Sequence, residues 1–331
     1  MKKIAYAAAA FLALSCQKQI TTLETQDLND FEFLEATVED LQNGYKNGSL
    51  SVAKVVQAYS NRIAAIDHSG PSLMSVIVVN PEAAAIADSL DLVAPENRGP
   101  LHGIPVLLKD NIDTHDQMAT TAGSRALAGS MPLEDSYVAQ KLRAAGAVIL
   151  GKANLSEWAN FRGQMSSSGW SGVNGQTRNP YVLTRTPCGS SSGSGVAVSA
   201  NLTLLAIGTE TNGSIVCPST VNGIVGIKPT VGLISRSGII PISYTQDTAG
   251  PMARTVADAA IALGALTGVD SKDAKTLASE GNALTDYTPF LKADGLQGKR
   301  IGWFKAAFGN HATTDSLTLK AIKTLKAQGA T

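Results

Sequence analysis

The sequence predicts an α/β protein whose mixed, mostly parallel central sheet is sandwiched between helices. Short apolar segments typical of buried strands alternate with amphipathic helical segments along most of the chain. Of the 331 residues, 44% are hydrophobic and only 5% are aromatic, which suits a tightly packed core in one or two domains. The alternation runs to Thr331, where another strand is expected, so we expect the fold to be incomplete at its C-terminus.

The N-terminal residues have the pattern of an export signal. A positively charged start precedes an apolar run over residues 4–14, which is too short to span a membrane as a mature helix. Ser15 and Cys16 follow, and a small residue before a cysteine is typical of a bacterial lipoprotein signal. The sequence therefore predicts a signal peptide over residues 1–15 and lipidation of Cys16, with plain secretion as the alternative.

The rest of the chain divides into a polar tether over residues 16–33 and one folded domain over residues 34–331. We expect an exported protein, in the periplasm or at the cell envelope. Its only membrane contact is expected to be the lipid anchor at Cys16.

The first half of the domain alternates helices with strands. Thr37 can cap one helix, and Ser49 or Ser51 can cap a second whose apolar face repeats at helical spacing. Asp135 is predicted to cap a later helix. The other predicted elements are strands at 75–79, 104–109 and 147–150, a helix at 81–90 and a helix beginning in 154–161.

The second half continues the pattern. Residues 196–208 are predicted to form a helix that leads into a strand, and Thr255 caps a helix that ends near residue 268. A strand is expected at 299–304. The last predicted helix ends at Gly329, a residue type that favours helix termination.

Charge and cysteine content narrow the class of protein. The 27 basic residues balance 27 acidic ones, so the sequence does not predict a nucleic-acid partner. Three cysteines are too few to predict a disulfide framework. If Cys16 is lipidated, only Cys188 and Cys217 can pair, and we expect buried free thiols there.

The segment PCGSSSGSG, residues 187–195, is too rich in serine and glycine for a helix and too flexible for a strand. It is not a P-loop, because Val196 stands where that motif needs lysine, and the dinucleotide-binding spacing is absent. It does fit a nucleophile elbow around Ser191. However, only His311 follows it, without a surrounding motif, which argues against a Ser-His-Asp triad.

Lysine is the next candidate base. Lys109 ends an apolar strand, and burial there lowers the pKa of a lysine because it disfavours the charged form. In the segment 207–219, a predicted strand is followed by a turn at Asn212 and Gly213, directly before Ser214. Successive amides in such a turn can converge into an oxyanion hole.

The loop after Lys109 also concentrates potential metal ligands. We expect no metal there, because carboxylates and a histidine in one polar loop are ordinary composition and no further ligands accompany them. The residues concerned are Asp110, Asp113, His115 and Asp116.

Three motifs in order carry a resemblance to the amidase signature family. They are HGIPVLLKDNID at 102–113, GSSSGSG at 189–195 and GTETNGSI at 208–215. The resemblance extends from about residue 35 to the end of the chain. Segments 179–202, 209–219 and 241–260 look most like bacterial peptide amidases.

This resemblance implies an amidase signature fold and an amide hydrolase with a Ser-Ser-Lys triad. Ser214 would be the nucleophile, Ser190 the bridging serine after a cis bond from Gly189, and Lys109 the base. An acyl-enzyme would form without metal or cofactor, stabilised by an oxyanion hole of backbone amides. Those amides would belong to Thr211, Asn212, Gly213 and Ser214.

The resemblance to peptide amidases implies hydrolysis of C-terminal peptide amides to acid and ammonia, with no obligate protein partner. The alternatives are an amidase for other small, aryl or fatty amides, or an amidotransferase A-type subunit. Val216 and Asn212 depart from the family pattern, which often has arginine and glycine there, and these changes leave the substrate open. Family members also continue beyond the predicted strand at 299–304.

Overall fold

The computed structural model describes residues 30–161 and 163–331, so the predicted signal peptide, Cys16 and most of the tether lie outside the described residues. The chain divides into two units, one ending at Leu34 and one spanning Glu35–Thr331. The second unit contains all the helices and strands below.

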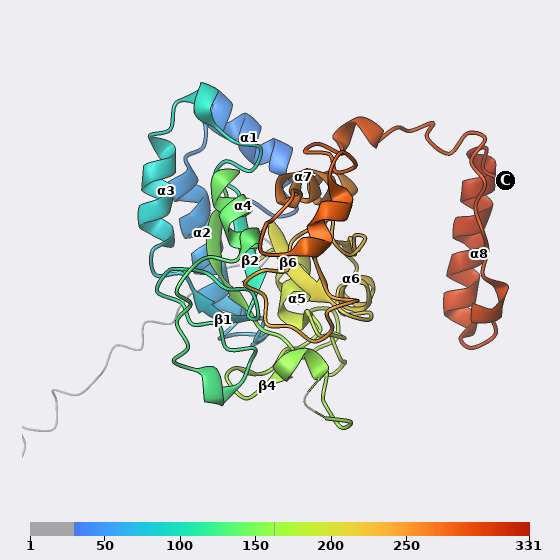
Figure 1. Ribbon diagram of the computed structural model, residues 1–331, viewed down its shortest axis with the longest axis horizontal. Coiled ribbons are helices and arrows are strands. Elements are labelled where there is room, and N and C mark those ends of the chain that lie inside the picture. Colours follow the sequence, from blue (N-terminus) through green and yellow to red (C-terminus); the bar gives the residue numbers. More distant parts are fainter. Residues whose placement is uncertain (1–29, 162) are drawn as a thin grey trace, which may run out of the picture. The chain divides into compact units, whose positions relative to one another are not determined.

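A six-stranded mixed sheet forms the centre of this unit (Figure 1). Its three inner strands β3, β2 and β6 pair in parallel, and the outer pairs are antiparallel. A separate two-stranded ribbon joins β4 (Trp170–Ser171) to β5 (Gly175–Gln176). The sheet order is β1 (Val76–Val79), β3 (Val148–Ala153), β2 (Pro105–Lys109), β6 (Leu205–Glu210), β8 (Thr248–Ala253), β7 (Val225–Gly226).

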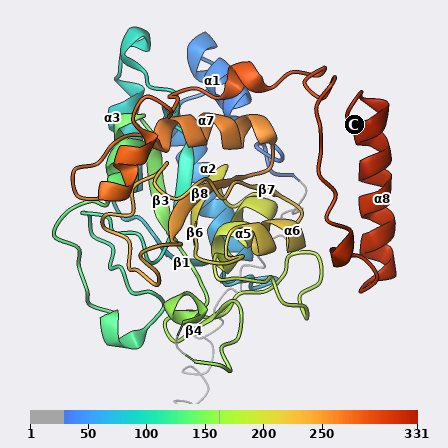
Figure 2. The same cartoon turned by 45° about the vertical axis from the view of Figure 1, so that its right-hand side comes forward.

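Strands β2, β3, β6 and β8 are buried at every position, because helices cover both faces of the sheet. Helix α5 contacts these four strands, while α7 contacts β6, β7 and β8 (Figure 2). Helix α7 also contacts α4. The α/β fold predicted from the sequence is confirmed. The helices are α1 (Val38–Asn47), α2 (Val52–Ile66), α3 (Ala83–Asp91), α4 (Tyr137–Ala144), α5 (Ser192–Ser199), α6 (Val216–Val221), α7 (Val256–Leu266) and α8 (Ala312–Ala327).

Most helix starts follow the predicted capping residues. Thr37, Ser51 and Thr255 each accept a backbone N–H in the first turn of α1, α2 and α7. The prediction for α4 was wrong: Ser136 Oγ accepts the Ala139 amide at 3.1 Å. Asp135 does not cap the helix, because its carboxylate binds a guanidinium instead.

The predicted helix at 154–161 does not form. The chain makes a 3₁₀ turn over Glu157–Asn160 in which Trp158 and Ala159 are left-handed, with φ of 51° and 52°. The physical reason is that distant carbonyls take the amides a helix would use. Ser156 N donates to Ser190 O at 3.0 Å, and Trp158 N donates to Ala122 O at 2.8 Å.

Two further segments differ from their predictions. Residues 192–195, predicted as loop, form the first turn of α5, where every residue is buried and small side chains allow close packing. Residues 299–304 form no regular strand. Instead Ile301 N donates to Thr331 O and Thr331 N donates to Lys299 O, each at 2.8 Å, while α8 has no buried residue.

Candidate active site

The candidate site lies at one edge of the sheet. The parallel strands β2, β3 and β6 end at Lys109, Ala153 and Glu210. Because the carboxyl ends of parallel strands meet at the same edge, segments far apart in sequence converge there. Helix α5 begins within the serine-rich segment 187–195, at Ser192, and contacts all three strands.

Lys109 is fully buried at this edge. Its Nζ lies 2.7 Å from Ser190 Oγ, 2.8 Å from Thr209 Oγ1 and 3.2 Å from Thr209 O. Burial lowers the pKa of Lys109 to about 7, against an opposing effect of the carboxylates of Asp247 and Glu210. A substantial neutral fraction near pH 7 makes this lysine a competent proton acceptor.

Among the four serines of the loop, Ser190 is the one that meets the lysine. The peptide bond between Gly189 and Ser190 is cis, as the resemblance implied. Ser191 Oγ donates to Thr209 O at 3.1 Å, and Ser192 Oγ donates to Cys188 O at 2.6 Å. The hydroxyls of these neighbours therefore bind the backbone, whereas the hydroxyl of Ser190 contacts the lysine.

The turn before Ser214 is held by the carboxylate of Glu210. Glu210 Oε1 accepts the Gly213 amide at 2.7 Å, and Oε2 accepts the amides of Ile215 and Val216 at 2.8 and 3.0 Å. Gly213 is left-handed, with φ of 82°. The three hydrogen bonds to Glu210 hold the turn in its curved conformation and cap the start of α6.

One part of the predicted oxyanion hole needs correction. The Gly213 amide is already bonded to Glu210, because the turn directs it toward that carboxylate. Within the described residues, the amides of Thr211, Asn212 and Ser214 donate to no protein acceptor. These three amides remain as the candidate oxyanion donors.

Ser214 itself is buried beside the serine loop. Ser191 N donates to Ser214 O at 3.1 Å, which holds the two loops side by side. In the described structure no hydrogen bond joins Ser190 Oγ to Ser214 Oγ. Such catalytic bonds often form only when substrate is bound.

A disulfide joins the two serine loops and corrects the expectation of free thiols. Cys188 and Cys217 are bonded, with Cα atoms 5.9 Å apart. Cys188 lies just before Ser190 in sequence, and Cys217 lies just after Ser214. The pairing depends on the folded approach of these loops, which their separation in sequence does not reveal.

Comparisons with known proteins identify the family of this chain. The family model described as Amidase matches residues 54–331. The solved peptide amidase of Stenotrophomonas maltophilia is 55% identical with a TM-score of 0.88, over 91% of this chain and 62% of that one. This chain belongs to the amidase family.

Two curated relatives extend the comparison. A probable amidase of Arabidopsis thaliana is 47% identical over 305 residues, covering 91% of this chain and 58% of the relative. The A-type subunit of the glutamyl-tRNA(Gln) amidotransferase of Thermosynechococcus vestitus is 40% identical, covering 89% of this chain and 60% of the relative. The chain therefore spans about 60% of the length of the relatives it matches.

Sequence reasoning missed a second buried lysine in this chain. Lys152 Nζ donates to Ile112 O at 2.5 Å and to Thr120 Oγ1 at 2.9 Å. Near it, burial raises the pKa of Asp110 to about 6, although the positive charge of Lys152 opposes the shift. The signal was present in the sequence, because Lys152 also stands near the end of an apolar strand.

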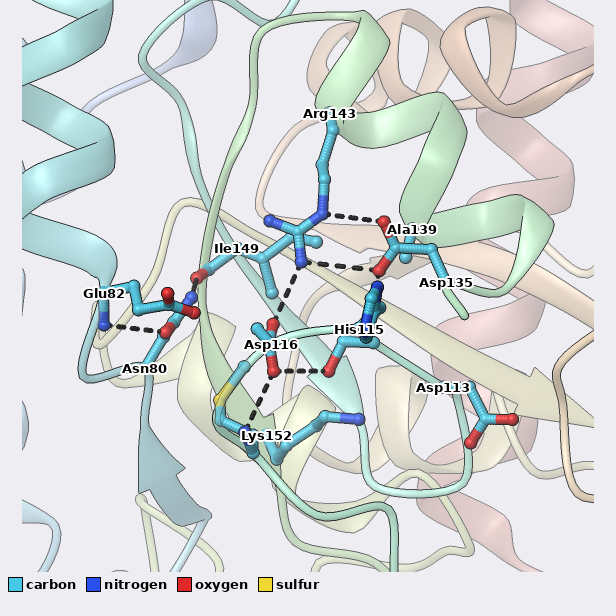
Figure 3. A network of polar contacts seen from close by, with 12 residues as sticks. Asn80, Glu82, Asp113, His115, Asp116, Asp135, Ala139, Arg143, Ile149 and Lys152 are labelled. Atoms are coloured by element: carbon cyan, nitrogen blue, oxygen red, sulfur yellow. Dashed lines mark hydrogen bonds and ion pairs between the residues drawn. The ribbon is translucent and has the colours of Figure 1, made fainter. Parts of the chain in front are cut away.

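Of the four residues considered for metal binding, Asp116 forms an ion pair with Arg143 (Figure 3). The guanidinium of Arg143 lies 3.0 Å from a carboxylate oxygen of Asp116 and 3.0 Å from one of Asp135. Asp135 also accepts the backbone N–H of His115 at 2.7 Å. Within the described ranges, no three His, Cys, Asp or Glu side chains gather as a metal site would require.

The membrane prediction depends on a part of the chain outside the described residues. In residues 30–161 and 163–331, no helix combines the length and apolar character needed to cross a bilayer.

Proposed function

We propose that this chain carries the catalytic residues of an amide hydrolase that acts through an acyl-enzyme. The observation that carries the proposal is the contact of 2.7 Å between Lys109 Nζ and Ser190 Oγ, two fully buried side chains. It is supported by the lowered pKa of Lys109, to about 7, which leaves the amine able to accept a proton.

The proposed reaction begins when neutral Lys109 takes the proton of Ser190 and Ser190 takes the proton of Ser214. Ser214 Oγ then attacks the amide carbon, and the carbonyl oxygen becomes an oxyanion facing the amides of Thr211, Asn212 and Ser214. The C–N bond breaks as Ser190 gives its proton to the nitrogen and receives one from protonated Lys109, which releases the amine or ammonia and leaves Lys109 neutral again. Water repeats the sequence on the ester, which releases the acid and restores Ser214.

The substrate class we propose is C-terminal peptide amides, which would give a free acid and ammonia. The likeness to the Stenotrophomonas maltophilia peptide amidase, at 55% identity, supports this choice. An amidotransferase A-type activity is the second candidate, because the Thermosynechococcus vestitus amidotransferase chain is 40% identical.

The test compares three serine variants in the full chain. Ser214→Ala is expected to abolish ammonia release from peptide amides, and Ser190→Ala to reduce it nearly as far. Ser191→Ala is the matched control and is expected to be much milder, because its hydroxyl binds only the backbone of Thr209. Near-normal turnover by Ser214→Ala would refute the mechanism.

Product analysis separates the two candidate functions. Mass spectrometry should show the terminal carboxamide converted to a carboxylate, with internal peptide bonds intact. Ammonia release only in the presence of partner subunits and charged tRNA would favour the amidotransferase function. Activity confined to aryl or fatty amides would leave the mechanism in place and refute the peptide substrate.

We also propose that Cys16 carries the lipid that holds the protein at a membrane surface. The support is the sequence pattern before Cys16. Detergent partitioning of the wild type and of Cys16→Ala tests it. Equal partitioning of the two would leave plain secretion.

A further inference from the structure

An apolar pocket lies next to the catalytic edge of the sheet. Its volume is about 260 Å³, and apart from Asn111 its lining is apolar. Trp158, Ala159 and Phe161 form one wall, and residues 240–242 form the other. At the volume of liquid water this corresponds to roughly nine water molecules, which is room for a benzyl or isobutyl group.

The first wall is attached to the bridging serine. Ser156 N donates to Ser190 O at 3.0 Å, two residues before Trp158. Trp158, Ala159 and Asn160 then follow one another in the left-handed region, with φ of 51°, 52° and 69°. Runs of left-handed residues other than glycine are costly and persist where surrounding contacts hold them, commonly at binding sites.

The second wall is attached to the candidate oxyanion turn. Asp247 Oδ1 accepts the hydroxyl of Thr211 at 2.5 Å, and Asp247 Oδ2 accepts the amide of Ile242 at 2.7 Å. The same carboxylate therefore contacts the turn and the pocket wall. The pocket cannot move far from Ser214 without breaking these bonds.

The remaining lining residues are Ala122 and Asn111, and Asn111 contacts a group that also binds Lys109. Asn111 Nδ2 donates to Thr209 Oγ1 at 3.1 Å, the atom that Lys109 Nζ also contacts. Asn111 O accepts the amide of Ile240 at 2.9 Å. All three attachments place the pocket beside the position where a substrate carbonyl would sit.

We propose that this pocket holds the side chain of the residue whose carboxamide is hydrolysed, and that it selects large apolar or aromatic side chains. The inference rests on the proposed function: the leaving group is ammonia, which has no side chain, so a side-chain pocket beside the carbonyl belongs to the acyl part. A charged side chain would lose its hydration there without gaining a partner.

The experiment measures kcat/KM for dipeptide amides that end in Phe, Leu, Gly or Lys. The wild type should prefer the Phe and Leu amides over the Gly amide by about tenfold or more. Phe161→Ala should lower the Phe-to-Gly ratio by about tenfold, and since Phe161 is 70% exposed its truncation should leave folding intact. Ile242→Asp should shift the preference toward the Lys amide.

The control is Leu133→Ala, which removes an exposed leucine outside the pocket lining and should leave every ratio unchanged. Amide hydrolysis with the same ratios in wild type, Phe161→Ala and Ile242→Asp would overturn the pocket assignment and leave the proposed function standing. No hydrolysis of any amide by the wild type would instead refute the proposed function. Thermal unfolding of each variant confirms that a changed ratio comes from folded protein.

Discussion

The surroundings of Lys109 and Lys152 differ although the two lysines lie on neighbouring strands. In the parallel pairing of β2 with β3, Lys109 stands opposite Ala153 and Lys152 stands opposite Leu108. Because successive side chains on a strand point to opposite faces, the two lysines face opposite sides of the sheet. Both are fully buried, and burial lowers the pKa of both.

The partners on each face separate their roles. Lys109 Nζ contacts the hydroxyls of Ser190 and Thr209, groups that can exchange protons. Lys152 Nζ also contacts a hydroxyl, that of Thr120, but four carboxylates raise its pKa against burial, compared with two for Lys109. The four belong to Asp110, Asp113, Asp116 and Asp135. Burial alone therefore does not make a lysine a general base. The side chains around each lysine decide whether it can transfer protons or only supports the structure.

The largest expected effect is on the rate when Lys109 is replaced. Lys109→Met should lower kcat by about 10²–10⁴-fold, because it removes the proposed base. Lys152→Met is the matched variant and should retain kcat to within a few fold. Steady-state kinetics on a peptide amide measures both. Equal losses of kcat in the two variants, with both folded, would contradict the division of roles.

The next effect concerns the disulfide between the serine loops. Replacing Cys188 and Cys217 together by serine should lower the free energy of unfolding by about 3 kcal/mol, because the unfolded chain gains freedom. Urea unfolding measures this. The loss of kcat should exceed that in Lys152→Met, because the bond borders Ser190 and Ser214. Unchanged kcat in the folded double variant would show that other contacts suffice to hold the loops.

A smaller effect is expected on stability when Lys152 is replaced. Lys152→Met leaves Ile112 O and Thr120 Oγ1 without their donor, which should cost about 1–3 kcal/mol in the free energy of unfolding. The loss of positive charge should also raise the pKa of Asp110 above about 6. Urea unfolding and carboxyl titration by NMR measure the two results. An unchanged midpoint would show that water replaces the lysine.

The last effect concerns the pH dependence of the wild type. The reactive form of Lys109 is the neutral amine, so the rate should rise with pH and reach half its maximum near the pKa of about 7. Below that pH it should fall by about tenfold per unit. Lys109→Arg should show no such rise, because arginine stays protonated. A flat profile from pH 5 to 9, with chemistry limiting, would contradict the assignment.

Local chemistry let several features be predicted from the sequence. Thr37, Ser51 and Thr255 cap their helices as predicted, because a cap depends on residues within one turn. The burial of Lys109 was predicted because this lysine ends an apolar strand, which leads to a buried edge of the sheet. Ser190 and Ser214 were selected by resemblance to a family, since composition alone left Ser191 as an alternative.

The sequence by itself determined the alternation of elements, the buried strand that ends at Lys109 and the motifs that contain both serines. Tertiary structure alone decided the Cys188–Cys217 bond, the engagement of the Gly213 amide by Glu210 and the left-handed turn at Trp158. The reason is physical. Each of these depends on atoms brought together by the order of strands in the sheet, whereas caps and periodicity depend on neighbours in the chain.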